Sequence, residues 1–271
     1  MHKIINAAFS GRFNDYDFLL DIARAVPGTG LELSIYSHKP DFMACQQAAK
    51  ARFDGIPLTF HGPFEDVEAA SAPGTLERQR FIDAWRYALD VYEDFGGESI
   101  VMHTHKMKHI NPDDMPLLRA YATEAIQEIA AEAVARKIRL TVENVGYWNV
   151  ESVLFNEEQY IALFDQLPQE VGSLIDVGHA VMNRWDVAHV VHKLNKRIFS
   201  YHLHNNNGCR DSHRPMFEDG NRYDAEEMTR LLLLTNCCSP DADWILEYAY
   251  GDLVTKELLT HDLAYLASLN K

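Results

Sequence analysis

The sequence predicts a single α/β domain, residues 1–271, folded as a closed (β/α)₈ barrel. Eight short apolar runs alternate with longer segments of helical period, and regular βα alternation is typical of a parallel sheet. Eight such units in 271 residues match the length of a closed barrel. An open doubly wound sheet is the alternative, but it usually begins with a glycine-rich turn. The first turn here, Ser10-Gly11-Arg12-Phe13, has no GxGxxG pattern.

The predicted strands are short runs rich in apolar residues, as expected for parallel strands that are buried on both faces. In chain order they are Ile4–Phe9, Leu31–Ile35, Pro57–Phe60, Ser99–His103, Arg139–Glu143, Ser173–Asp176, Phe199–His204 and Trp244–Glu247.

The predicted helices show apolar residues at intervals of three and four. The clearest pattern joins Phe81, Trp85, Ala88, Tyr92 and Phe95, and Gly96-Gly97 follows it as a stop signal. A second pattern joins Leu118, Ala122, Ala125, Ile129 and Ala133. Weaker patterns predict helices over Tyr16–Val26, Asp41–Arg52, Glu157–Gln166, Asp186–Lys193, Ala225–Leu234 and Val254–Leu269.

Composition narrows the classes of function. The 25 Lys and Arg residues against 40 Asp and Glu give a formal charge of −15, which disfavours binding to nucleic acid. No apolar stretch approaches the roughly 18 residues of a membrane span, and the N-terminus shows no signal peptide. Four cysteines without CxxC spacing predict neither a disulfide framework nor a zinc ribbon. We expect a soluble, cytoplasmic protein with no membrane partner.

Histidines and carboxylates gather where the predicted strands end. Because the carboxyl ends of barrel strands meet on one face, these side chains are expected to converge. Six successive strands end in such residues, which are His61, the pair His103 and His105, Glu143, Asp176, the pair His202 and His204, and Glu247. Converging carboxylates repel one another unless a cation is bound, so a divalent metal site is predicted. Since side chains alternate with a period of two, both members of each histidine pair face the same side, and the choice within each pair stays open.

Three stretches resemble the xylose isomerase-like, endonuclease IV-like superfamily of divalent-metal barrels. They are Val142-Glu143-Asn144, Ile175-Asp176-Val177-Gly178-His179, and the segment from His202-Leu203-His204 through Asp211-Ser212-His213-Arg214-Pro215. The last is similar to the HLHxNxG…DxHxP loop of that family. The chain departs from the family in its three asparagines after His204 and in Met216-Phe217-Glu218-Asp219-Gly220, where the loop is usually glycine-rich.

The resemblance implies roles for individual residues. Its core metal ligands match Glu143, Asp176, His204 and Glu247. In the nuclease branch three zinc ions use further ligands, which match His61, His103, His179, Asp211 and His213. In the epimerase branch, substrate contacts match His179 and Arg210. We also expect His61 and Trp148 to line the substrate site, Trp148 because an aromatic residue after Glu143 can wall a sugar ring.

The leading hypothesis is a metal-dependent isomerase or epimerase of a small sugar or sugar-like hydroxycarbonyl compound. Glu143 and Glu247 are the expected base and acid, and a divalent ion is expected to stabilise the charge that develops on the substrate oxygens. The histidine content favours Zn²⁺ or Mn²⁺, with Mg²⁺ and Co²⁺ also compatible. The alternatives are a multi-zinc phosphodiesterase and a non-catalytic metal-binding barrel. Neither a GxSxG elbow nor a P-loop is present, and a homo-oligomer is left open.

Overall fold

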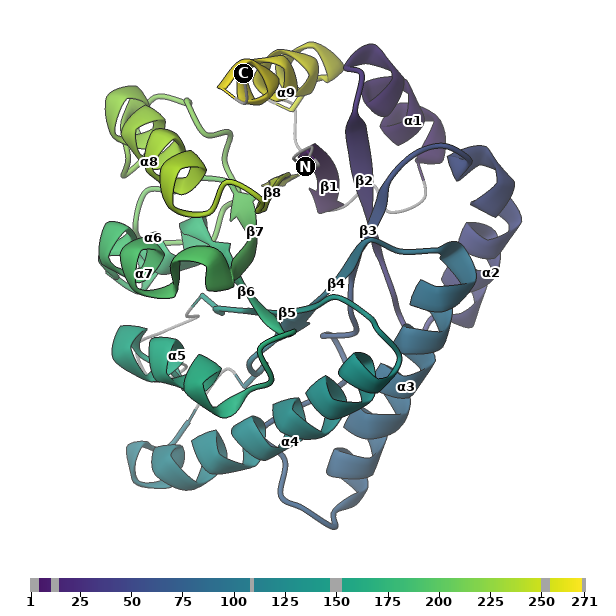
Figure 1. Cartoon of the computed structure of the whole chain (residues 1–271), viewed down its shortest axis with the longest axis vertical. Coiled ribbons are helices and arrows are strands. Elements are labelled where there is room, and N and C mark those ends of the chain that lie inside the picture. The colour runs from purple at the N-terminus through teal and green to yellow at the C-terminus, as the bar shows by residue number, and fades with distance from the viewer. Residues whose placement is uncertain (1–4, 11–14, 108–109, 147–152, 250–253, 270–271) are drawn as a thin grey trace.

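In the computed structural model, eight parallel strands close into one barrel in sequence order, from β1 to β8 and back to β1. The structure describes residues 5–10, 15–107, 110–146, 153–249 and 254–269. Figure 1 looks down the ring of strands, and it confirms the predicted (β/α)₈ barrel. The strands are β1 Ile5–Ser10, β2 Thr29–Ser34, β3 Leu58–His61, β4 Ser99–His103, β5 Leu140–Glu143, β6 Gly172–Asp176, β7 Ile198–Leu203 and β8 Asp243–Ala249.

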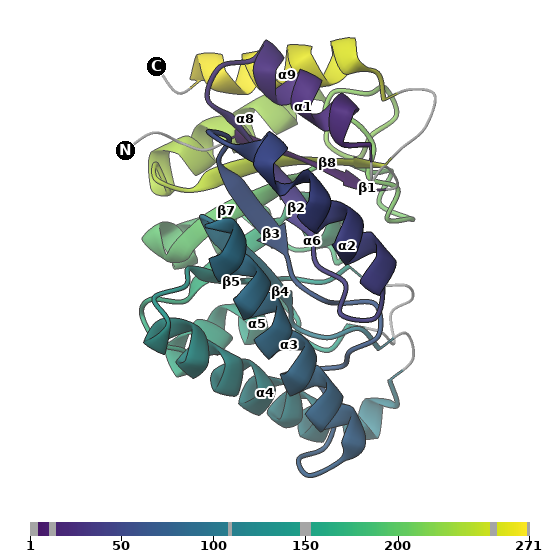
Figure 2. The same cartoon turned by 90° about the vertical axis from the view of Figure 1, so that its right-hand side faces the viewer.

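Helices surround the strands, as the side view in Figure 2 shows. They are α1 Tyr16–Ala25, α2 Pro40–Ala49, α3 Leu76–Phe95, α4 Met115–Ala135, α5 Glu157–Leu163, α6 Val177–Met182, α7 Val187–Leu194, α8 Ala225–Cys238 and α9 Lys256–Leu269. Short 3-10 segments are η1 Lys50–Phe53, η2 Pro112–Asp114, η4 Phe164–Gln166 and η5 Asn195–Arg197. Among the described residues, no helix is long and apolar enough to cross a membrane.

The element bounds differ from the predicted ones by a few residues, and one helix was not predicted. Gly96 adopts a left-handed conformation with φ 73° and ends α3 where the glycine pair predicted a stop. The helix missed by the sequence patterns is α6, which begins directly after β6. It has only six residues and includes Gly178, so it shows too little helical periodicity to be recognised.

Inside the barrel, an apolar floor lies one layer below the strand ends. Val101, Leu174 and Ile245 come from β4, β6 and β8 and form a small fully buried cluster of their own. Each stands two residues before a strand-end residue that the sequence singles out, so both point to the barrel interior. The main core lies between the strands and the helices.

Candidate metal centre

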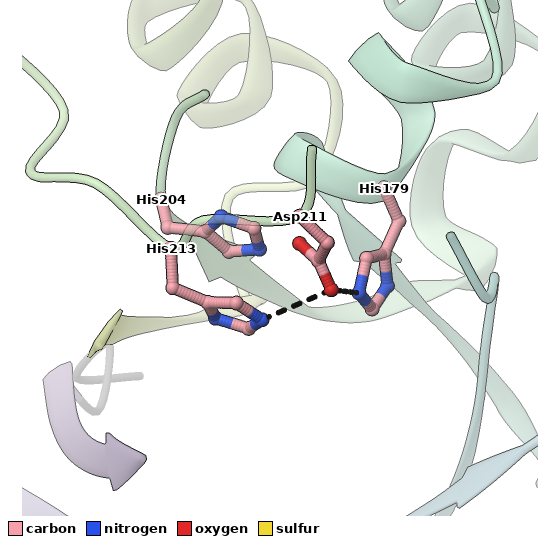
Figure 3. A group of neighbouring side chains, drawn as sticks. All are labelled: His179, His204, Asp211 and His213. Atoms are coloured by element: carbon pink, nitrogen blue, oxygen red, sulfur yellow. Dashed lines mark hydrogen bonds and ion pairs between the residues drawn. The ribbon is translucent and has the colours of Figure 1, made fainter. Parts of the chain in front are cut away.

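The predicted site residues converge at the carboxyl ends of the strands. His61, His103, Glu143 and Asp176 are the last residues of β3, β4, β5 and β6, His204 directly follows β7, and Glu247 lies near the end of β8. We call Glu143, Asp176, His204 and Glu247 the central group. On one side lie His61 and His103, the strand group. On the other lie His179, Asp211 and His213, the loop group (Figure 3).

The carboxylates of the central group face one buried point. His202 marks that point, because its Nδ1 atom lies 3.1 Å from Oε2 of Glu247, 3.6 Å from Oε2 of Glu143 and 3.8 Å from Oδ2 of Asp176. His204 approaches from above, with its Nε2 atom 3.0 Å from the Asp176 carboxylate. Ligand atoms of Asp176, His204 and Glu247 all lie within 4.8 Å of one another, as do those of Glu143, Asp176 and His202.

Gly178 makes room for His204. A Cβ atom at this position would lie 2.0 Å from Cε1 of His204, far inside contact distance. The neighbouring Asp176 caps helix α6, because its Oδ1 atom accepts the backbone N–H of His179 at 2.7 Å. The cap starts the helix that carries His179 and also fixes the orientation of the Asp176 carboxylate.

The strand group faces Glu143. The Nε2 atoms of His61 and His103 are 3.0 Å apart and lie 3.6 and 3.3 Å from Oε2 of Glu143. Phe64 packs against both rings, with centroids 4.9 Å from His61 and 5.2 Å from His103. Once free of protons, these two ring nitrogens and the carboxylate oxygen form a donor set suited to a divalent cation.

The loop group converges on Asp211. Oδ2 of Asp211 lies 3.1 Å from Nε2 of His179 and 3.3 Å from Nε2 of His213, as the dashed lines in Figure 3 show. The ring of His213 stacks on that of His204, with centroids 3.9 Å apart. The loop group therefore contacts the central group directly.

Three of these histidines share one pattern of hydrogen bonding. The Nδ1 atom of each ring lies 2.9 to 3.0 Å from a backbone carbonyl oxygen, that of Gly62 for His61, Asn144 for His179 and Glu247 for His213. A carbonyl only accepts, so each Nδ1 must carry a proton and donate it. The Nε2 atoms then point toward the centre, where a bound ion would replace any proton that they carry. This arrangement is typical of metal-ligating histidines.

The charges of the site are strongly coupled. Burial raises the pKa of Glu143, but the imidazoles of His103 and His202 outweigh it and hold that pKa well below its usual range. Burial also opposes ionisation of Glu247 and Asp211, yet facing histidines lower the pKa of each carboxyl. Burial lowers the pKa of His213, but Glu247 and Asp211 raise it to about 9. Without an ion, protons on the histidines supply the compensating positive charge.

Four buried polar atoms of the centre have no hydrogen-bond partner among the residues that the structure describes. They are Oε2 of Glu143, Oε2 of Glu247, Nδ1 of His202 and Nδ1 of His204. A buried polar atom without a partner is costly, and three of these four lie within the central cluster of ligand atoms. The carboxylate and imidazole donors present there fit a divalent cation.

The structure distinguishes the members of both histidine pairs. His103 faces Glu143, whereas His105 turns away and packs against Phe155, with its Nε2 atom 3.4 Å from the Leu154 backbone nitrogen. His202 lies deeper in the barrel than His204 and contacts Glu32. Both members of this second pair point inward.

Two other predicted residues are either exposed or outside the residues that the structure describes. Arg210 is exposed. Trp148 lies outside the described residues. The asparagines that replace acidic family residues serve as braces: Asn206 donates from its side chain to the Gly178 carbonyl at 2.8 Å, and Asn205 donates to that of Tyr223 at 2.8 Å.

The strand-end rule missed two buried residues that organise the site. Asn144 belongs to the Val142-Glu143-Asn144 stretch, but the sequence indicated no role for it. It bridges two strands, because its side chain donates to the Asp176 carbonyl at 3.0 Å and accepts the Asp176 N–H at 2.8 Å. Glu32 lies in the middle of β2, and its place between two leucines gave no sign of a site residue.

The comparisons with known proteins agree with the barrel fold. The solved structure of a D-tagatose 3-epimerase-like protein superposes with a TM-score of 0.74, at 16% identity over 99% of this chain and 98% of that one. The structure of an AP endonuclease, family 2, from Brucella melitensis gives a TM-score of 0.68, at 19% identity over 99% of each chain. Both likenesses show the fold.

A sequence relative is the uncharacterized protein y4fM of Sinorhizobium fredii (strain NBRC 101917 / NGR234), 24% identical over 172 residues, or 60% of this chain. The aligned part spans only 52% of that protein, so the chain matches about half the length of its curated relative. A model of the xylose isomerase-like TIM barrel family matches residues 20–269. The chain therefore belongs to the xylose isomerase-like TIM barrel family.

Proposed function

We propose that this protein is a divalent-metal-dependent isomerase or epimerase of a small sugar or sugar-like hydroxycarbonyl compound. One observation carries the proposal: the buried Glu143 and the partly buried Glu247 approach the same point from opposite parts of the barrel, beside Asp176 and His204. Moving a proton next to a carbonyl needs a base on one side of the carbon and an acid on the other. Two carboxylates across one centre supply both.

Each side chain then has a distinct part in the reaction. Asp176 and His204 hold the ion, which supplies positive charge for the substrate oxygens when it is bound. Glu143 removes the proton, and Glu247 returns one to the substrate. The low pKa of Glu143 keeps it ionised at neutral pH and able to accept a proton. Glu247 is also ionised in the resting protein, so it has to take up a proton from solvent before it returns one to the substrate. His61 and His179 lie beside Glu143 and are placed to orient the substrate hydroxyls.

Ion and substrate preferences follow from the donors. Several imidazoles beside carboxylates favour Zn²⁺ or Mn²⁺, and Mg²⁺ and Co²⁺ also suit the carboxylate-rich central group. We also propose that Arg210 and Trp148 contact the substrate. Arg210 is exposed on the loop that precedes Asp211, so it reaches a substrate only if that loop folds over the site.

Solvent exchange tests the proposal directly. Metal-loaded protein is incubated in D₂O with a panel of ketoses and keto-sugars, and deuterium at the carbon next to the carbonyl is measured by NMR. We expect metal-dependent wash-in for at least one compound. Absence of exchange across the panel with a fully loaded protein would contradict an isomerase or epimerase.

A multi-metal phosphoesterase is the second candidate, and one observation favours it. The strand group and the loop group each provide a separate cluster of ligand atoms beside the central group, more than one ion requires. Metal analysis after dialysis distinguishes the candidates: one ion per chain supports the epimerase, and three ions with hydrolysis of bis(p-nitrophenyl) phosphate support the phosphoesterase. Because of the −15 charge, we expect no incision of abasic duplex DNA at physiological salt.

A further inference from the structure

A buried acid–imidazole pair lies beneath the centre and has no part in the mechanism above. His202 on β7 is fully buried, and Glu32 on β2 is 4% exposed. They meet across the barrel interior, with Nε2 of His202 3.0 Å from Oε1 of Glu32. Thr59 donates its hydroxyl to the other oxygen of Glu32 at 3.2 Å. Burying a carboxylate and an imidazole this deeply costs free energy of folding, so we expect the pair to have a function.

The pair fixes which nitrogen of His202 faces the centre. A carboxylate accepts hydrogen bonds and does not donate, so Nε2 of His202 carries a proton that points at Glu32. The ring is further held by a near-parallel contact with His61, with centroids 6.0 Å apart and 21° between the planes. The Nδ1 atom therefore points toward the three carboxylates of the central group.

That Nδ1 atom is placed as a ligand would be. It is buried, and no described residue forms a hydrogen bond with it. Its distances to oxygens of Glu247, Glu143 and Asp176 are 3.1, 3.6 and 3.8 Å. Two donor atoms that are each about 2.1 Å from one ion lie roughly 3.0 Å apart at a right angle and roughly 3.6 Å apart at 120°. The three distances are close to those expected if Nδ1 and the carboxylate oxygens bind one ion.

We propose that Nδ1 of His202 is a further ligand of the ion held by the central group, and that Glu32 is the positioning residue that orients it. The proposal rests on the metal centre of the proposed function and adds to it. The family resemblance assigns only His204 on this strand. Ligation by His202 closes the side of the ion that faces the apolar floor and leaves the opposite side, at the strand ends, for substrate.

The experiment uses full-length protein loaded with less than one equivalent of Co²⁺. Zn²⁺ affinity is measured by competition with a chromogenic chelator, the Co²⁺ geometry by its visible absorption, and the number of imidazole ligands by X-ray absorption fine structure. The variants are Glu32→Gln and the double variant Glu32→Gln/His202→Phe, which avoids leaving a buried unpaired carboxylate. The matched controls are Glu98→Gln and His192→Phe, both exposed.

The expected results differ between the variants. Glu32→Gln keeps the shape of the pair but weakens its hold on the ring, so we expect Zn²⁺ affinity to fall by about 10–100-fold. The double variant loses one imidazole from the Co²⁺ shell and shifts the visible bands, and the controls match wild type. If both variants keep wild-type affinity, bands and imidazole count, His202 is not a ligand. In that case the protonated ring of His202 only positions the neighbouring carboxylates, and the proposed function stands. If wild-type protein binds no divalent ion at all, both proposals fail.

Discussion

The strand group and the loop group offer similar donors to the same centre, but they are built differently. His61 and His103 end neighbouring strands, and the barrel's own hydrogen bonds fix their backbones. His179 stands on the six-residue helix α6, and Asp211 and His213 lie in the long connection between β7 and α8. His213 even adopts a positive φ of 43°, which is unfavourable for a histidine. The backbone at the strand ends is held by the hydrogen bonds of the barrel, whereas the position of the loop group depends on hydrogen bonds within and around its own loop.

The largest expected effect comes from the carboxylates that both groups flank. Glu247→Gln keeps the shape of the side chain but removes its ability to take up and return a proton, so deuterium exchange should fall by about 10²–10⁴-fold. Glu143→Gln should behave alike, and the exposed Glu98→Gln serves as the control. Metal content must be measured in parallel because a lost ion mimics a lost base. An ion-loaded Glu247→Gln protein with near-normal exchange would disprove the two-carboxylate mechanism.

Metal removal should destabilise the loop group more than the strand group. An ion at 100 times its dissociation constant stabilises the folded state by about 2.7 kcal/mol, so chelation should lower the urea midpoint of unfolding. Hydrogen exchange should then show where the loss falls. We expect residues 205–216 to lose protection and β3 and β4 to change little. Equal deprotection of both regions would show that the strand ends also need the ion.

Gly178 tests how tightly the central group is packed. Gly178→Ala places a methyl group against the His204 ring, and overpacking of this kind costs about 1–3 kcal/mol. The measurement is the free energy of unfolding of the metal-free protein. In the double variant Gly178→Ala/His204→Ala the clash is gone, so the penalty of the alanine should disappear. A penalty that persists there would place the strain in the backbone instead.

Two neighbouring asparagines test the brace of the loop. The buried Asn206 donates to the Gly178 carbonyl and accepts the Gly208 N–H, each at 2.8 Å. Asn206→Ala should cost about 1 kcal/mol of stability and weaken ion binding at the loop group. Asn207→Ala is the matched control, since Asn207 is exposed and accepts the N–H of Cys209 within the same loop. If both variants behave alike, the brace does not set the position of the loop.

The smallest effect is expected at His105, which faces away from the centre. His103→Ala should weaken ion binding at the strand group. His105→Ala should leave it unchanged and loosen only the packing against Phe155. Metal titration of the two variants measures the difference. A loss of ion binding in His105→Ala would mean that the ring rotates into the site.

Strand-end residues were predictable because the barrel places them by a simple rule. Apolar runs showed where each strand stops, and His61, Glu143 and Asp176 lie at those points. Glu32 escaped because it lies in mid-strand, where the sequence does not show that the barrel interior is polar. The choice between His103 and His105 also needed the structure, since an even spacing puts both residues on one face of an extended strand until the strand ends.

Asp176 has two tasks, and together they restrict its motion. One oxygen is tied to the first turn of α6 through the His179 N–H, while the carboxylate also faces His204. Rotation of this carboxylate would uncap the helix and displace His179 from Asp211. If the ion changes between one-oxygen and two-oxygen coordination during turnover, the change is expected at Glu143 or Glu247, whose Oε2 atoms have no hydrogen-bond partner among the described residues. Asp176 would then be the fixed carboxylate of the centre and the two glutamates the adjustable ones.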